Sequence, residues 1–97
     1  MSVIINFYIF PLDKGESLSS YVARAIKVIE ESGLPFELTA MGTSIEGEWP
    51  EVMAVVDKCF RALENDCNRV YLAFKADYRK GPAGRLKGKV ESVKQKL

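Results

Sequence analysis

This 97-residue chain contains no histidine, so it lacks the usual general base at neutral pH and the commonest metal ligand. Any catalysis would have to rest on carboxylates, lysine or tyrosine. Its only cysteines are Cys59 and Cys67, whose spacing matches neither a redox CxxC motif nor a paired zinc knuckle. We expect ordinary buried thiols, no metal site and no cofactor.

Long hydrophobic runs are also missing. No apolar stretch approaches the roughly 20 residues that a membrane-spanning helix requires, although 47% of the residues are hydrophobic. The first six residues have no basic segment and no small-residue cleavage site, and they are typical of a strand rather than a signal peptide. These observations predict a cytoplasmic protein that does not enter a membrane.

The net charge is only +1, but its distribution is uneven. Residues 1–68 carry 5 basic and 11 acidic side chains, whereas residues 69–97 carry 9 basic and 2 acidic ones. A basic segment of this kind can bind nucleic acid or can pack near acidic helices within an assembly. The basic residues alternate with an apolar stripe, which favours the second interpretation.

Hydrophobic periodicity divides the chain into alternating strands and helices. Residues 2–11 form a β-rich run that ends at a proline, and residues 36–40, 43–47 and 69–78 alternate as strands do, with Gly42 forming a turn. Helical spacing follows three further sets of apolar residues: Val22, Ala25, Ile26 and Ile29; Val52, Val55, Val56, Cys59, Phe60 and Leu63; and Leu86, Val90, Val93 and Leu97.

The helix ends carry recognisable signals. Ser17, Ser19 and Ser20 offer N-caps to the first helix, and Gly33 suits its C-terminal end. Pro50 is acceptable in the first turn of the second helix, which we expect to end within 66–68.

The order β-α-β-β-α-β with an additional C-terminal helix predicts an α+β, ferredoxin-like fold for a single domain, residues 1–97. The first and third strands should be central, with the two main helices on one face of the antiparallel sheet. The other sheet face is too apolar to remain exposed, so we expect self-association to cover it. Its apolar residues are Ile4, Tyr8, Phe10, Met41 and Tyr71.

Several polar side chains fall on that apolar face by strand alternation: Asn6, Tyr8, Ser44, Glu46 and Lys75. Polar groups buried without partners cost roughly 1 to 3 kcal/mol each. The group is therefore either a satisfied network at an oligomer interface or a small-molecule pocket built at that subunit interface. Glu46 could hydrogen-bond an aminopyrimidine or could simply pair with Lys75.

Taken together, these residues resemble the pattern of the thiamine-binding, ferredoxin-like family (YkoF-like), over about residues 3–95. The resemblance rests on these positions: Pro11, Ser20-Tyr21-Val22-Ala23, Ser32-Gly33-Leu34, Met41-Gly42-Thr43, Glu46-Gly47, Asp77, Arg79, Lys89-Val90 and Ser92-Val93. Ala40 stands where the family pattern has a proline before the Met-Gly-Thr turn.

The resemblance implies a homotetramer, built as a dimer of dimers, that binds thiamine or its hydroxymethylpyrimidine moiety without catalysing a reaction. It implies Met41, Gly42, Thr43 and Glu46 as a pocket strip, with Tyr21 at a helix start nearby.

Other functions occur on the same fold. An RNA-binding module could use Tyr8 and Tyr71 to stack bases, but the aromatic RNP pattern is absent and the net charge is near zero, so nucleic acid is not favoured as a partner. An acylphosphatase-like enzyme would need an arginine in the loop after the first strand, where residues 12–15 are Leu-Asp-Lys-Gly. The residues from Asp77 to Lys80 form either a solvated strand end or a contact to a phosphate or another subunit.

Overall fold

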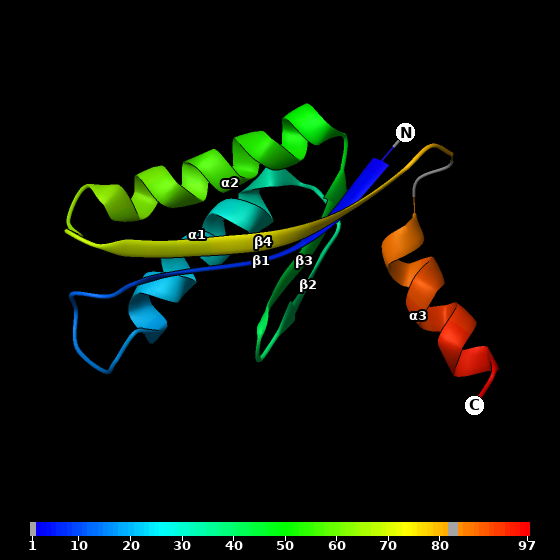
Figure 1. Ribbon diagram of the computed structural model, residues 1–97, viewed down its shortest axis with the longest axis horizontal. Coiled ribbons are helices and arrows are strands. Elements are labelled where there is room, and N and C mark those ends of the chain that lie inside the picture. Colours follow the sequence, from blue (N-terminus) through cyan, green and yellow to red (C-terminus); the bar gives the residue numbers. More distant parts are fainter. Residues whose placement is uncertain (1, 82–83) are drawn as a thin grey trace.

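The computed structural model describes residues 2–81 and 84–97. In these two ranges, four strands and three helices follow one another in the predicted order (Figure 1). Their bounds are β1 Ser2–Pro11, α1 Ser19–Ser32, β2 Phe36–Thr39, β3 Gly42–Gly47, α2 Trp49–Glu64, β4 Val70–Arg79 and α3 Arg85–Gln95. The described residues contain no helix that is both long enough and apolar enough to cross a membrane.

The strands form one antiparallel sheet in the order β2-β3-β1-β4, which confirms the ferredoxin-like prediction. β1 lies at the centre, with Ile5 opposite Ile45 of β3 and Ala76 of β4. The β1–β4 pairing extends over ten residue pairs, from Ser2–Arg79 to Pro11–Val70. β2 and β4 are therefore the free edges.

Helices α1 and α2 cover one face of the sheet, as predicted (Figure 1). The odd-numbered residues of β1 from Val3 to Ile9 point to these helices and are buried. They meet the apolar stripe of α2 and the inner residues of α1. The buried core comprises Val3, Ile5, Phe7, Ile9, Ala25, Ile29, Ile45, Val52, Val55, Val56, Cys59, Leu63 and Cys67.

Both cysteines are buried free thiols, as expected. Burial raises the pKa of Cys59 to about 12, because a thiolate would lose its hydration there. Neither side chain is in the reactive thiolate form at neutral pH.

The helix termini follow the sequence signals in part. Gly33 ends α1 with a φ of 75°, as predicted. The serine N-cap prediction for α1 is wrong, because Leu18 occupies the cap position and makes no side-chain cap hydrogen bond. In α2, Pro50 lies in the first turn beside a capping box formed by Glu48 and Glu51, and the helix ends at Glu64, before the expected 66–68.

The β2–β3 hairpin corrects the predicted position of the turn. Ala40 and Met41 form the turn, and Gly42 is already the first residue of β3. The Thr39 hydroxyl donates a hydrogen bond to the Gly42 carbonyl and accepts one from the Met41 N–H, which closes the turn. A glycine is needed at 42 because a Cβ would lie 2.9 Å from Asn6 Oδ1 and 3.1 Å from the Phe7 carbonyl.

Candidate ligand-binding site

The predicted strip from Met41 to Gly47 is divided between the two faces of the sheet. Thr43 lies opposite Phe7 of β1 and is buried on the side of the helices. Ser44 and Glu46 lie opposite Asn6 and Ile4, on the other face. Alternation along β3 therefore sends one half of the strip to the helix layer and the other half to the open face.

A cavity of about 500 Å³ lies on the helix side, between α1 and the β2–β3 hairpin. Met41, Gly42 and Thr43 line it from the hairpin. Thr39, Ala40 and Leu38 extend the same wall. The opposite wall comes from β1 and α1: Phe7, Tyr8, Ile9, Phe10, Leu18, Val22, Ala25, Ile26 and Ile29. The volume falls in the range of roughly 300 to 1,000 Å³ typical of small-molecule sites.

The chemistry of this cavity is predominantly apolar. Among the described residues, no charged side chain lines it; the hairpin contributes the hydroxyls of Thr39 and Thr43, whereas Tyr8 borders it from β1 with its ring on the open face. Met41 is 85% exposed, so it borders the mouth, whereas Thr43 is 3% exposed and lies deep in the wall. Such a lining suits a flat, uncharged ring with a few hydrogen-bonding edges.

On the open face, the structure brings together several of the polar groups predicted there. The Asn6 amide donates to Ser44 Oγ at 3.1 Å, and Lys75 lies opposite Asn6 on the other side of β1. Next to them, Tyr8, Phe10 and Tyr71 form an aromatic cluster with ring centroids 5.5 to 5.9 Å apart. The interaction with Tyr71 raises the pKa of Tyr8 above its ordinary value.

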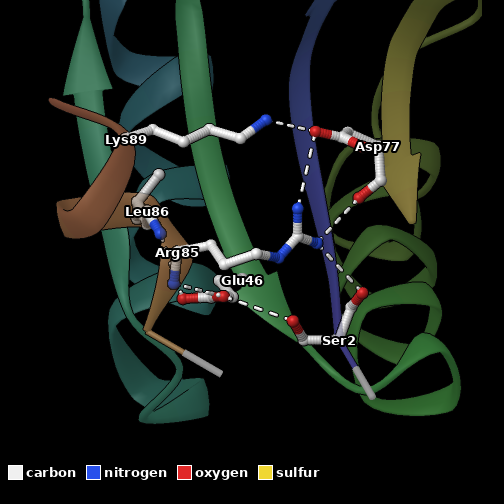
Figure 2. A network of polar contacts seen from close by, with 6 residues as sticks. All are labelled: Ser2, Glu46, Asp77, Arg85, Leu86 and Lys89. Atoms are coloured by element: carbon white, nitrogen blue, oxygen red, sulfur yellow. Dashed lines mark hydrogen bonds and ion pairs between the residues drawn. The ribbon is translucent and has the colours of Figure 1, made fainter. Parts of the chain in front are cut away.

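Glu46 is committed to helix α3, which lies on the open-face side of the sheet (Figures 1 and 2). Its carboxylate accepts hydrogen bonds from the backbone N–H groups of Arg85, at 2.9 Å, and Leu86, at 3.4 Å. The Ser2 hydroxyl donates a third hydrogen bond at 3.4 Å. A carboxylate at a helix N-terminus satisfies unpaired N–H groups and complements the helix dipole.

Side chains of α3 make further contacts with the ends of β1 and β4, as Figure 2 shows. Arg85 Nη2 donates to the backbone carbonyls of Ser2 and Asp77, at 3.1 and 3.2 Å. Lys89 donates to the Asp77 carboxylate, and Arg85 forms an ion pair with it at 3.5 Å. The Lys89 hydrogen bond holds the pKa of Asp77 below its ordinary value, with smaller contributions from Arg85 and Arg79.

The nine residues predicted for the site thus fall into two groups. Those lining the cavity are Tyr8, Met41, Gly42 and Thr43. Those outside the lining are Asn6, Tyr21, Ser44, Glu46 and Lys75. Tyr21 is in the first turn of α1, where the Arg24 guanidinium lies 4.8 Å from its ring centroid. Ligand contacts by the second group remain predictions.

Sequence reasoning missed both the α1 side of the cavity and the capping role of Glu46. The α1 residues are apolar at helical spacing, and this pattern does not distinguish a core residue from a cavity wall. A signal for the cap was present: Gly84 precedes α3 and has no side chain to satisfy the first N–H groups. Such a helix start needs an acceptor from elsewhere in the chain.

Comparison with known proteins identifies the family to which the chain belongs. The sequence profile of a family described as thiamine-binding protein matches residues 5–94. A UPF0045 protein of Mycobacterium bovis is 41% identical over 98 residues, covering 100% of this chain and 96% of that protein. A solved hypothetical protein of Methanocaldococcus jannaschii is 34% identical, with a TM-score of 0.87 and 95% of each chain covered.

A further solved structure, from Thermotoga maritima, is of a protein named as a candidate for thiamine biosynthesis or salvage. It is 28% identical, with a TM-score of 0.84, and the match covers 96% of this chain and 99% of that one. The family profile extends over nearly all of the chain and includes the hairpin, the cavity walls and the start of α3. The chain therefore belongs to the thiamine-binding protein family.

Proposed function

We propose that this protein binds thiamine, or its hydroxymethylpyrimidine moiety, without catalysing a reaction, and that the pyrimidine ring occupies the cavity between α1 and the hairpin. The observation that carries the proposal is the position of Met41, Gly42 and Thr43 in the wall of that cavity, within a chain of this family. Met41 supplies a surface that packs on a flat ring, and the Thr43 hydroxyl supplies a hydrogen-bonding group.

The lining also favours one part of the ligand over the other. An aminopyrimidine is neutral at pH 7, whereas the thiazolium ring of thiamine carries a permanent positive charge. The described lining has no carboxylate to balance that charge, and a cation moved into an apolar site loses hydration energy. The pyrimidine ring is therefore the part held inside, and hydroxymethylpyrimidine should bind at least as tightly as thiamine.

Isothermal titration calorimetry with each ligand tests the proposal. Met41→Ala should weaken binding about tenfold because the side chain borders the mouth, and its 85% exposure means that the free energy of unfolding should change little. Thr43→Val keeps the side-chain volume and removes the hydroxyl. Leu97→Ala serves as a control, since Leu97 is 99% exposed and outside the lining. Absence of heat and of a thermal shift at millimolar ligand would refute the proposal.

We also propose that the chain self-associates into a homotetramer, built as a dimer of dimers. The aromatic cluster leaves Tyr8 39% and Tyr71 46% exposed on the open face, and β4 is a free edge beside the exposed side chains of Phe74 and Tyr78. Two separate surfaces of this kind are what a dimer of dimers requires. Light scattering should give a tetramer mass, and Tyr71→Lys should reduce it. A monomer mass for the unmodified chain would contradict this part of the proposal.

The aromatic cluster supports RNA binding as the second candidate function, because stacked, exposed rings on an open sheet face are the surface that RNA-recognition domains present to bases. A gel shift with single-stranded RNA at increasing salt separates the two functions. A shift that Tyr71→Ala abolishes would favour RNA. Pyrimidine binding without any shift would favour the first proposal.

A further inference from the structure

A second hollow, of about 680 Å³, lies where β4 ends and α3 begins. Four basic side chains line it: Arg79, Lys80, Arg85 and Lys89. The Ser92 hydroxyl adds a neutral hydrogen-bonding group, and no acidic side chain is among the described lining residues. These four residues belong to the basic segment 69–97 identified in the sequence.

The hollow has more positive charge than its surroundings neutralise. Two carboxylates lie beside it: Asp77 contacts Lys89 and Arg85, and Glu46 accepts hydrogen bonds from the backbone N–H groups of Arg85 and Leu86. Arg79 is near enough to contribute to lowering the Asp77 pKa, so three cations surround the Asp77 carboxylate. Lys80 adds a fourth cation. Exposed like charges held this close together repel one another, and a multivalent anion relieves the repulsion.

Three glycines border the hollow, and an added Cβ at Gly81, Gly84 or Gly88 would meet no atom within 4 Å. Gly81 and Gly84 have φ values of 134° and 86°, which favour glycine for backbone reasons, so among these three Gly88 alone has no conformational reason to be glycine. Gly88 is within α3, where glycine is less stable than alanine. Gly88 borders the hollow, so its missing side chain leaves space there instead of relieving a contact with the rest of the fold.

This hollow is distinct from the proposed pyrimidine cavity. Arg85 is bonded to the Ser2 end of β1, whereas Tyr8 of the same strand lines the cavity. Six residues of extended chain separate these positions, which corresponds to about 20 Å. A single small ligand cannot reach both sites within one copy of the chain.

We propose that the hollow between the end of β4 and α3 binds a phosphate group, either inorganic phosphate or the phosphate of a small ester. Arg79 and Lys80 supply exposed charge at its rim, and Lys89 and Ser92 supply donors from α3. Arginine and lysine together provide forked and single-point donors that match phosphate oxygens.

Calorimetry with the full chain at low ionic strength, using inorganic phosphate and phenyl phosphate as probes, tests the proposal. One phosphate should bind per chain. Arg79→Gln with Lys80→Gln should weaken binding at least tenfold. The matched control, Lys27→Gln with Lys58→Gln, removes two exposed lysines outside the hollow and should leave the affinity unchanged. Tighter binding of phenyl phosphate identifies an ester as the source, and equal affinity identifies the free ion; both outcomes support the site.

Gly88→Ala separates binding from folding. It should raise Tm by roughly 2 to 8 °C, because alanine favours the helix, while it weakens phosphate binding at least threefold by narrowing the hollow. Two results would overturn the proposal: no saturable phosphate binding by 10 mM, or equal affinity in the Arg79–Lys80 and control variants. Binding of single-stranded RNA that depends on Arg79 and Lys80, without saturable phosphate binding, would also overturn it.

Discussion

At the scale of single residues, Glu46 is the clearest case of a predicted ligand-binding residue that has a structural role. Its side chain is 2% exposed, and both oxygens accept hydrogen bonds from the first N–H groups of α3. A buried carboxylate of this kind is stable only while these donors remain in place. Glu46 therefore holds the N-terminus of α3 against the central sheet.

We predict that Glu46→Ala lowers the free energy of unfolding by about 1 to 3 kcal/mol, because it leaves the Arg85 and Leu86 N–H groups without their acceptor. Glu46→Gln keeps one acceptor oxygen and removes the charge, so it should cost about half as much. Urea unfolding followed by circular dichroism measures both values. Equal stability of all three proteins would contradict the capping role.

The same two variants separate the structural role of Glu46 from the ligand role predicted for it. If Glu46 also contacts the pyrimidine, Glu46→Gln should lower ligand affinity at a temperature where the protein is fully folded. If it acts only on α3, calorimetry should give an unchanged affinity. The sequence pattern placed Glu46 correctly on the open face, but α3 folds onto that face from 39 residues away, and no local pattern predicts such a contact.

At the scale of secondary-structure elements, the β2–β3 hairpin determines the shape of the proposed ligand cavity. Its two-residue turn carries Met41 to the mouth, and Gly42 passes close to β1 at Asn6 and Phe7. Strand alternation then places Thr43 inside the helix layer. A change in register of one residue would reverse these positions.

We predict that Gly42→Ala destabilises the protein by about 1 to 3 kcal/mol, because the added methyl group meets Asn6 Oδ1 at 2.9 Å and because φ is 148°. Gly15→Ala provides the comparison: its φ is 78°, but a Cβ there meets no atom within 4 Å, so only the backbone cost applies. Thermal unfolding should give the lower Tm for Gly42→Ala. The reverse order would show that close approach at Gly42 is unimportant.

The elements also explain how far the sequence could predict the fold. Period-two and helical patterns were sufficient for the strand order and the helix-covered face, because residues such as Ile5 and Val52 repeat regularly. The hairpin turn was misplaced because Gly42 suggests a turn, whereas here glycine serves a close approach inside β3. The cavity was not predictable, since its α1 wall is indistinguishable from core in a single sequence.

At the scale of the whole molecule, the ionisable groups predict how stability depends on pH. The Asn68 N–H lowers the pKa of Asp13, Arg24 lowers that of Asp66, and Lys89 lowers that of Asp77. Each folded-state pKa is below the unfolded value, so the stabilisation is complete above about pH 4 and is lost as pH falls through the folded-state pKa. No histidine titrates near neutrality.

We therefore expect Tm to be nearly constant between pH 5 and 7 and to fall below pH 4. Arg24 donates to both Asp66 oxygens, at 2.8 and 2.7 Å. Asp66→Asn removes the negative charge and one of these two acceptors, so it should lower Tm at pH 7 and make the further loss at pH 3 smaller. Calorimetric scans from pH 2.5 to 7 measure both effects. A Tm at pH 3 equal to that at pH 7 would contradict the assignment.

The hydrogen bond from Arg85 to the Ser2 carbonyl joins residues 83 positions apart. During synthesis on the ribosome, β1 is made before α3, so its Ser2 end cannot acquire this partner until the 83 residues that follow Ser2 have been translated. The layer formed by α1, α2 and the sheet can assemble earlier, while α3 and the corner around Glu46 must follow. The order of synthesis thus places the attachment of α3 after the assembly of that layer.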